Sequence, residues 1–123
     1  MTDKKIRTVI LYEHYFADFF QQQRPKVKDK ILWTIRLVER QERIPEEYFK
    51  HIENTKGLYE IRVQHGGNAF RIFCFFDSSR LIVLGNAFQK KTQKTPAHEI
   101  ERALNIKAIY EKENNPQNAR PIR

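Results

Sequence analysis

A change of hydrophobic period near residue 57 is the feature that most constrains how this chain folds. Upstream of it, four apolar residues recur at the spacing of one helical face: Val27, Ile31, Ile35 and Val38. Pro25 opens this segment, as proline does in the first turn of a helix. Downstream, apolar and polar residues alternate over 57–64, the pattern of a half-buried strand. The chain therefore combines helices with a sheet.

Turn signals divide the second half into three strands. The segment His65-Gly66-Gly67-Asn68 predicts a tight hairpin turn after the strand at 57–64, because glycine and asparagine tolerate a positive φ. Strands are then expected at 69–76 and at 81–88, with a turn at 77–79 between them. One face of the 69–76 strand carries apolar side chains that include Cys74, which we expect to be buried.

The remaining segments complete an α+β order. A first strand is expected at 6–12, a helix at 13–23, and a loop with a short helical turn at 44–57. The last helix follows Thr95 as its N-cap and Pro96 at its first position, with an apolar face of Ile100, Ala103 and Leu104. The expected order is β-α-α-β-β-β-α, an antiparallel sheet packed against helices in one domain over 1–113. The tail from 114 to 123 is expected to be disordered.

Charge and composition exclude several classes of protein. Lys and Arg total 23 against 15 Asp and Glu, a net charge of +8 that favours a polyanionic partner. A single cysteine excludes an internal disulfide framework, and no apolar run is long enough to span a membrane. The amino terminus lacks a signal-peptide pattern, so we expect a cytoplasmic protein. Scattered histidines and the absence of nucleotide-binding and zinc motifs predict no metal and no cofactor.

Basic residues on the strands leave two interpretations open. Arg62 and Arg71 fall out of phase with the core-facing residues on adjacent strands, and Glu60 shares their face. This face is either stabilised by a cross-strand Glu–Arg pair or open to bind a phosphodiester backbone, for which the planar guanidinium is well suited. In the second case Phe73, Phe75 and Phe88 offer stacking surfaces for bases, although core packing competes for them.

Three segments carry a family resemblance: GLYEIRV at 57–63, FRIFCFF at 70–76 and AFQKKTQKTPAHEIERA at 87–103. They resemble the phage-related HigB-like branch of the RelE/ParE superfamily of toxins, over roughly residues 6–112. The resemblance implies a compact microbial-RNase-like fold. It also implies cleavage of mRNA on the translating ribosome and neutralisation by a cognate antitoxin, often of the helix-turn-helix type.

The resemblance also implies roles for individual residues. Arg71 matches the arginine that contacts the scissile phosphate, and Arg62 matches a basic position on the preceding strand. Lys90 falls near a basic residue that follows the last strand. Four further residues are assigned to RNA binding: Lys56, Phe88, Lys91 and Lys94.

The implied reaction needs no metal, because the RNA 2′-hydroxyl attacks the adjacent phosphorus and leaves a 2′,3′-cyclic phosphate. Its base is either Glu60 or a lysine of lowered pKa, and its acid is one of the lysines at 90–94. Glu60 stands where RelE-type relatives have a second basic residue, and Thr95-Pro96 replace their tyrosine. Two functions therefore stay open: an mRNA endoribonuclease, or a noncatalytic basic binding protein such as a ParE-like inhibitor of DNA gyrase.

Overall fold

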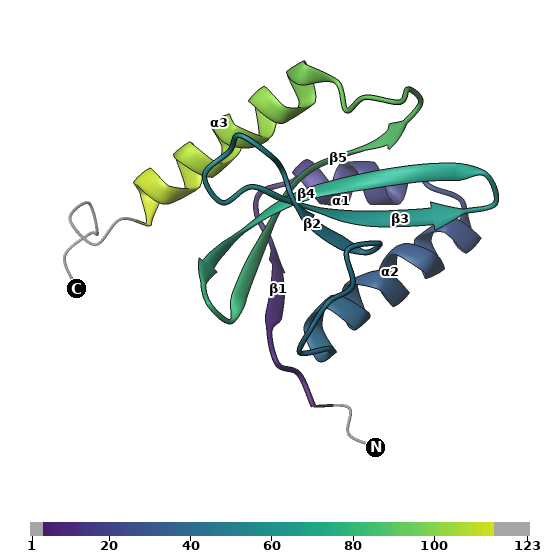
Figure 1. Ribbon diagram of the computed structural model, residues 1–123, viewed down its shortest axis with the longest axis horizontal. Helices are drawn as coiled ribbons and strands as arrows, with labels where there is room; N and C mark the ends of the chain where they lie inside the picture. Colours follow the sequence, from purple (N-terminus) through teal and green to yellow (C-terminus); the bar gives the residue numbers. More distant parts are fainter. Residues whose placement is uncertain (1–3, 115–123) are drawn as a thin grey trace.

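The part of the chain that the structure describes has five strands and three helices. The computed structural model describes residues 4–114 (Figure 1). The elements in chain order are β1 (Thr8–Leu11), α1 (Tyr15–Gln21), α2 (Pro25–Arg40), β2 (Phe49–His51), β3 (Tyr59–His65), β4 (Asn68–Ser78), β5 (Leu81–Lys90) and α3 (Ala97–Glu113). The strands lie side by side in the order β1-β5-β4-β3-β2.

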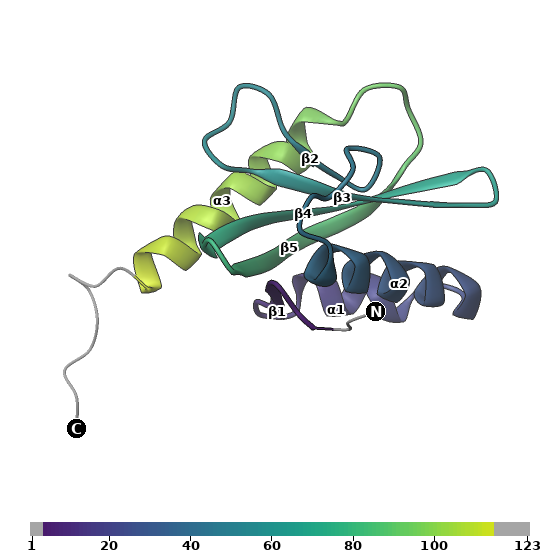
Figure 2. The ribbon, with the colours of Figure 1, turned by 60° about the horizontal axis from the view of Figure 1, so that its bottom comes forward.

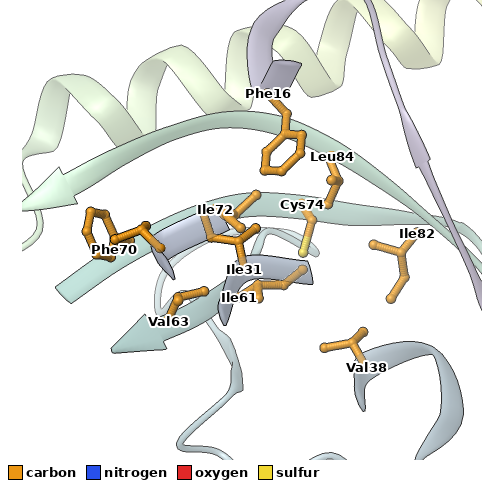
Figure 3. Packing of buried hydrophobic residues seen from close by; sticks show 11 residues of the cluster. Phe16, Ile31, Val38, Ile61, Val63, Phe70, Ile72, Cys74, Ile82 and Leu84 are labelled. Atoms are coloured by element: carbon orange, nitrogen blue, oxygen red, sulfur yellow. The ribbon is translucent and has the colours of Figure 1, made fainter. Parts of the chain in front are cut away.

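Helices cover both faces of the sheet, α1 and α2 on one side and α3 on the other (Figure 2). The main core lies under α1 and α2, and Ile31 and Val38 of α2 are fully buried against it. Figure 3 shows Ile31 close to Ile72 of β4, within the cluster that also contains Val38 and Cys74. On the opposite face Phe73 and Phe75 pack beneath α3. Because β4 alternates its side chains between two covered faces, its middle reads as a continuous apolar run.

The β3–β4 hairpin turns at two glycines. Gly66 and Gly67 have φ of +57° and +87°, and His65 pairs with Asn68 on either side of them. Two successive positive φ values are those of a type I′ turn, whose twist matches that of the flanking strands. The tip of this hairpin points away from α3 (Figures 1 and 2). The tip half of the hairpin is therefore left without a helix on the α3 side.

A bulge in β5 seats α3 on the sheet. Ile72 pairs with Ala87 and Cys74 with Leu84, so two residues of β5, Gly85 and Asn86, lie opposite Phe73 alone. The buried amide of Asn86 donates to the backbone oxygen of Glu99 at 3.2 Å and to its carboxylate at 3.0 Å. At the other end of α3, the Tyr110 hydroxyl donates to Asp77. These contacts fix the position of both ends of α3 on the sheet.

The predicted α+β class is confirmed, whereas the arrangement of the sheet differs from the prediction in two respects. The expected loop at 44–57 contains an edge strand, β2, which is too short to show a period in the sequence. The sheet is also mixed rather than antiparallel, because β1 pairs with β5 in parallel. The Val9 amide donates to the Glu39 carboxylate at 3.0 Å, a contact between β1 and α2 that no local pattern reveals.

The start and the apolar face of α3 also differ from the prediction. Pro96 is the N-cap and Thr95 makes no cap, because the helix begins one residue later than expected. Leu104 is exposed, whereas Ala103 is confirmed as buried and Ile100 as partly buried against the core. The buried face continues through Ile106 and Tyr110. The predicted disordered tail falls on 115–123, outside the described residues. Asn114, also assigned to that tail, caps α3 through its amide group, which donates to the Tyr110 carbonyl.

Adjacent residues of α2 provide a direct test of this packing. Ile31→Ala is expected to lower the free energy of unfolding by about 2–5 kcal/mol, because it opens a cavity at a fully buried position. Leu32→Ala, at a position that is 45% exposed, is expected to change it by about 0.5 kcal/mol or less. Urea unfolding followed by circular dichroism measures both. Equal effects of the two substitutions would contradict the assignment of the buried face.

Candidate functional site

Arg71 lies at the centre of the sheet, just beyond the part that α3 covers. Its cross-strand partners are Arg62 on β3 and Phe88 on β5. Arg71 shares its face of β4 with Phe73, the first residue on that strand to pack under α3. Because side chains two residues apart on a strand share a face, burial of Phe73 beneath α3 places the Arg71 guanidinium beside the edge of that helix.

The carboxylate of Glu60 lies between the two arginines. Its Oε1 is 3.6 Å from Arg71 Nε, and its Oε2 is 3.6 Å from Arg62 Nε. Glu60 and Arg71 are each only 6% exposed, so neither charge is tolerable there without the other. The Oε1 and Nε atoms are both buried and make no hydrogen bond, although they form an ion pair. Arg71 does donate through Nη1 to the Phe70 carbonyl at 3.1 Å.

Two lysines complete the group. Lys50 on β2 is the cross-strand partner of Glu60. Lys90, the last residue of β5, pairs with Ala69 of β4. Burial lowers the pKa of Lys90, and the positive charges of Arg71, Arg62 and Lys50 lower it further. The negative charge of Glu60 acts in the opposite direction and raises it. Burial likewise lowers the pKa of Arg71, against the charge of Glu60, yet an arginine stays protonated at neutral pH.

We call these five residues, Lys50, Glu60, Arg62, Arg71 and Lys90, the basic cluster. Four cations surround one carboxylate, so the cluster has a net charge of +3 at neutral pH. A concentration of like charge that lowers a lysine pKa also attracts an anion, and a phosphodiester is the anion that the guanidinium fork fits best.

Two hollows give access to the basic cluster, and Arg71 lines both. The first, of about 420 Å³, is bounded by Arg62, Arg71 and residues of α2 and of the segment before β2. The second, of about 700 Å³, is bounded by Arg71, Lys90, Lys91 and the hairpin tip. An elongated ligand that crossed from one hollow to the other would pass the guanidinium of Arg71.

The structure brings together only some of the residues predicted from the sequence. Arg71, Arg62, Glu60 and Lys90 meet in the basic cluster, and Lys91 lines the second hollow. Lys94 lies exposed further along the β5–α3 connection. Lys56 lies exposed in the β2–β3 connection, where the neighbouring Gly57 approaches Lys107 of α3.

Of the two interpretations of this face, the cross-strand Glu–Arg contact is present in the structure. The Arg71 side chain is buried beside Glu60 and is not turned to water, as an open face would require. Phe73 and Phe75 are core residues under α3. Phe88 is half-buried with its ring centroid 5.5 Å from that of Phe73, so most of its surface is used in packing. Stacking surfaces for bases have to be sought elsewhere.

Lys50 and Tyr48 are the members of the site that the sequence analysis missed. Both lie in the segment that was expected to be a loop, and Tyr48 borders the first hollow. The Tyr48 carbonyl accepts a hydrogen bond from the Arg62 amide at 2.8 Å, which ties this segment to β3. The available signal is the run Tyr48-Phe49-Lys50-His51-Ile52, in which aromatic and β-branched residues are typical of a strand.

Residues 4–114 contain neither a cluster of metal ligands nor a helix that could span a membrane. Over residues 4–114, no three His, Cys, Asp or Glu side chains come together in a way that suits a metal ion. Cys74 is confirmed as buried, and burial raises the pKa of its thiol. Within the same residues, no helix has both the length and the apolar character needed to cross a membrane.

One comparison with known proteins gives a match. Residues 18–108 match a family described as phage derived protein Gp49-like (DUF891). No curated protein matches the chain. The matched range begins within α1 and ends within α3, so it includes the whole basic cluster and both hollows.

The electrostatic coupling of the basic cluster predicts opposite shifts of the Lys90 pKa in two variants. Lys90 is expected to titrate below the ordinary lysine value of 10.5. Glu60→Gln removes the opposing negative charge and lowers the pKa further, whereas Arg62→Gln removes a repelling cation and raises it. NMR titration of the lysine side chains measures these shifts, and Lys50→Gln is a weaker control in the same direction as Arg62→Gln. An unchanged Lys90 pKa in both variants would contradict the coupling.

Proposed function

The chain belongs to the Gp49-like family of phage-derived proteins, and from this we propose that it is the toxin of a type II toxin–antitoxin system that cleaves mRNA on the ribosome. The Gp49-like family is associated with toxins of toxin–antitoxin systems, of RelE/HigB-like type in general. The HigB-like branch, the ribosome dependence and the endoribonuclease activity are parts of the proposal. The observation that carries it is the meeting of Arg62, Arg71 and Lys90 around Glu60, beside two hollows that Arg71 borders.

The basic cluster suits the stabilisation of a pentacoordinate phosphorane. When the RNA 2′-hydroxyl attacks the neighbouring phosphorus, negative charge accumulates on the non-bridging oxygens. In the proposal, Arg71 and Arg62 neutralise that charge. Glu60 is a positioning residue, because its burial between the two guanidiniums keeps it from the 2′-hydroxyl and fixes the direction of both. Its place as a candidate base passes to Lys90.

Lys90 is the residue best suited to accept a proton. Its lowered pKa moves its titration toward neutral pH, where a base is most effective. Lys91 lines the same hollow and is the candidate acid for the 5′-oxygen that leaves. Bond making and breaking then yield a 2′,3′-cyclic phosphate and a 5′-hydroxyl, with one proton taken up by Lys90 and one given by Lys91. The reaction as proposed requires no metal ion and no cofactor.

The proposal also names partners. The protein acts in the cytoplasm on ribosome-bound mRNA, and a cognate antitoxin, of the helix-turn-helix type in the HigB-like branch, neutralises it. Lys94 and Lys56 are exposed and outside the basic cluster, so their part in RNA binding is one of charge alone. A noncatalytic role is the competing function, and the Glu60–Arg71 ion pair favours it, because that pair also has a purely structural use.

Substitution of Arg71 tests the proposed chemistry. Arg71→Ala is expected to reduce mRNA cleavage on translating ribosomes by about 100- to 1000-fold with a much smaller loss of ribosome binding, because the contact strengthens in the transition state. Arg71→Lys is expected to restore only part of the activity, since a point charge lacks the two-pronged fork. Reconstituted translation with mapping of the mRNA ends measures cleavage.

The matched control is Arg80→Ala, which removes the same charge in the turn between β4 and β5, at the other end of β4. The Arg80→Ala variant is expected to cleave mRNA at the rate of the parent protein. Because Arg71→Ala leaves the buried Glu60 without its partner, thermal melting is recorded for each variant, and Arg62→Ala, at a more exposed position, serves as a second probe. A folded Arg71→Ala variant with normal cleavage would return Arg71 to a structural role. DNA synthesis that stops before protein synthesis upon expression would favour the gyrase inhibitor.

A further inference from the structure

A second aromatic surface lies beside the basic cluster, on the α2 side of the sheet. Trp33 of α2 is 44% exposed, and its ring centroid is 5.6 Å from that of Tyr48 at an interplanar angle of 67°. The ammonium of Lys30 lies over the Trp33 ring, 4.3 Å from its centroid. An exposed indole in contact with a second aromatic ring and a lysine ammonium presents both a stacking surface and a cation at one place.

This surface is continuous with the basic cluster. The first hollow, of about 420 Å³, is bounded by Lys30 and Tyr48 on one side and by Arg62 and Arg71 on the other. A shallow depression of about 470 Å³ shares Lys30 with it and is bounded also by Lys26, Asp29, Trp33 and His65. Lys30 therefore borders both the hollow that contains Arg71 and the depression that contains Trp33.

We propose that Lys30, Trp33 and Tyr48 form a nucleobase subsite, in which a base of single-stranded RNA next to the scissile phosphate stacks on the aromatic pair. This inference rests on the proposed function, because the scissile phosphate is the one held at Arg71. Lys30 contacts the phosphate between the stacked base and the basic cluster. The subsite supplies the stacking surface that Phe73, Phe75 and Phe88 cannot, since those rings are used in packing beneath α3.

The chemistry of the surface favours nucleic acid over an apolar polypeptide. Single-stranded nucleic acid is bound where aromatic faces for the bases alternate with cations for the phosphates. Here the Trp33 ring contacts both the Tyr48 ring and the Lys30 ammonium, and Lys30, Tyr48 and Arg62 border the same hollow. The carboxylate of Glu47 also borders the first hollow, which suits the amino groups of a base and disfavours an acidic peptide.

Fluorescence tests the subsite directly, because Trp33 is the only tryptophan in the sequence. The probe is a short single-stranded RNA with 2′-O-methyl groups, which binds without being cleaved. It is expected to quench the fluorescence of the intact protein in a saturable manner. An oligonucleotide of the same length with abasic positions keeps the phosphates, and it is expected to bind more weakly and to quench less.

Variants separate stacking from charge. Trp33→Ala is expected to weaken the affinity for the labelled oligonucleotide by about 5- to 100-fold, the range reported for the loss of one base-stacking ring. Trp33→Phe is expected to restore most of it. The matched control is Leu32→Ala, which truncates the neighbouring residue of equal exposure and is expected to leave the affinity unchanged. Lys30→Ala is expected to reduce the salt dependence by about one counterion, whereas Trp33→Ala leaves it unchanged.

The outcomes distinguish this inference from the proposed function. Equal affinity of Trp33→Ala and the parent protein, or quenching that the abasic oligonucleotide reproduces in full, would overturn the subsite while cleavage at Arg71 stood. Trp33-dependent RNA binding by a protein that cleaves no mRNA would support the subsite and remove the endoribonuclease. Quenching by polyglutamate but not by RNA would overturn the subsite and assign the surface to an acidic polypeptide.

Discussion

The ion contacts of Glu60 with Arg62 and Arg71 are the constraint on which the site depends. A guanidinium as buried as that of Arg71 would destabilise the sheet if it lacked a counterion, and removal of one partner from such a pair costs about 3–5 kcal/mol. Glu60 supplies the counterion for two arginines at once. The contact is one of charge without a hydrogen bond, and both Glu60 Oε1 and Arg71 Nε are buried. In the proposed function, the same carboxylate stabilises the sheet and positions the two guanidiniums for the phosphate.

The architecture around this ion group explains where the protein is open. α3 is held by Asn86 at one end and Tyr110 at the other, and it covers the aromatic half of one sheet face. The tip half of the β3–β4 hairpin projects beyond α3 (Figure 2). Two hollows border the basic cluster. The bulge at Gly85 and Asn86 both seats α3 and brings Phe88 opposite Arg71. In the proposed function, the end of α3 therefore decides which part of the sheet is left to bind RNA.

The sequence was sufficient for the parts of the structure that have a local signal. The α2 stripe, the glycine turn at 66–67 and the alternation of β3 and β4 follow from periodicity, and the facing positions of Arg62 and Arg71 follow from the hairpin. The Glu60–Arg71 contact was one of two interpretations of the strand pattern, and the sequence could not choose between them, because the burial of Arg71 also depends on where α3 ends. The parallel pairing of β1 and the role of β2 depend on contacts between distant segments, and so Lys50 and Tyr48 were missed.

NMR of the arginine side chains tests most directly the claim that the basic cluster holds an RNA phosphate. The Nε–Hε cross peaks of the 15N-labelled protein are recorded during titration with uncleavable single-stranded RNA and assigned through Arg62→Lys and Arg71→Lys. The account predicts saturable shifts of the Arg71 and Arg62 signals, with those of Arg80 and Arg102 unmoved. Saturable RNA binding that shifts only arginines outside the basic cluster would contradict it.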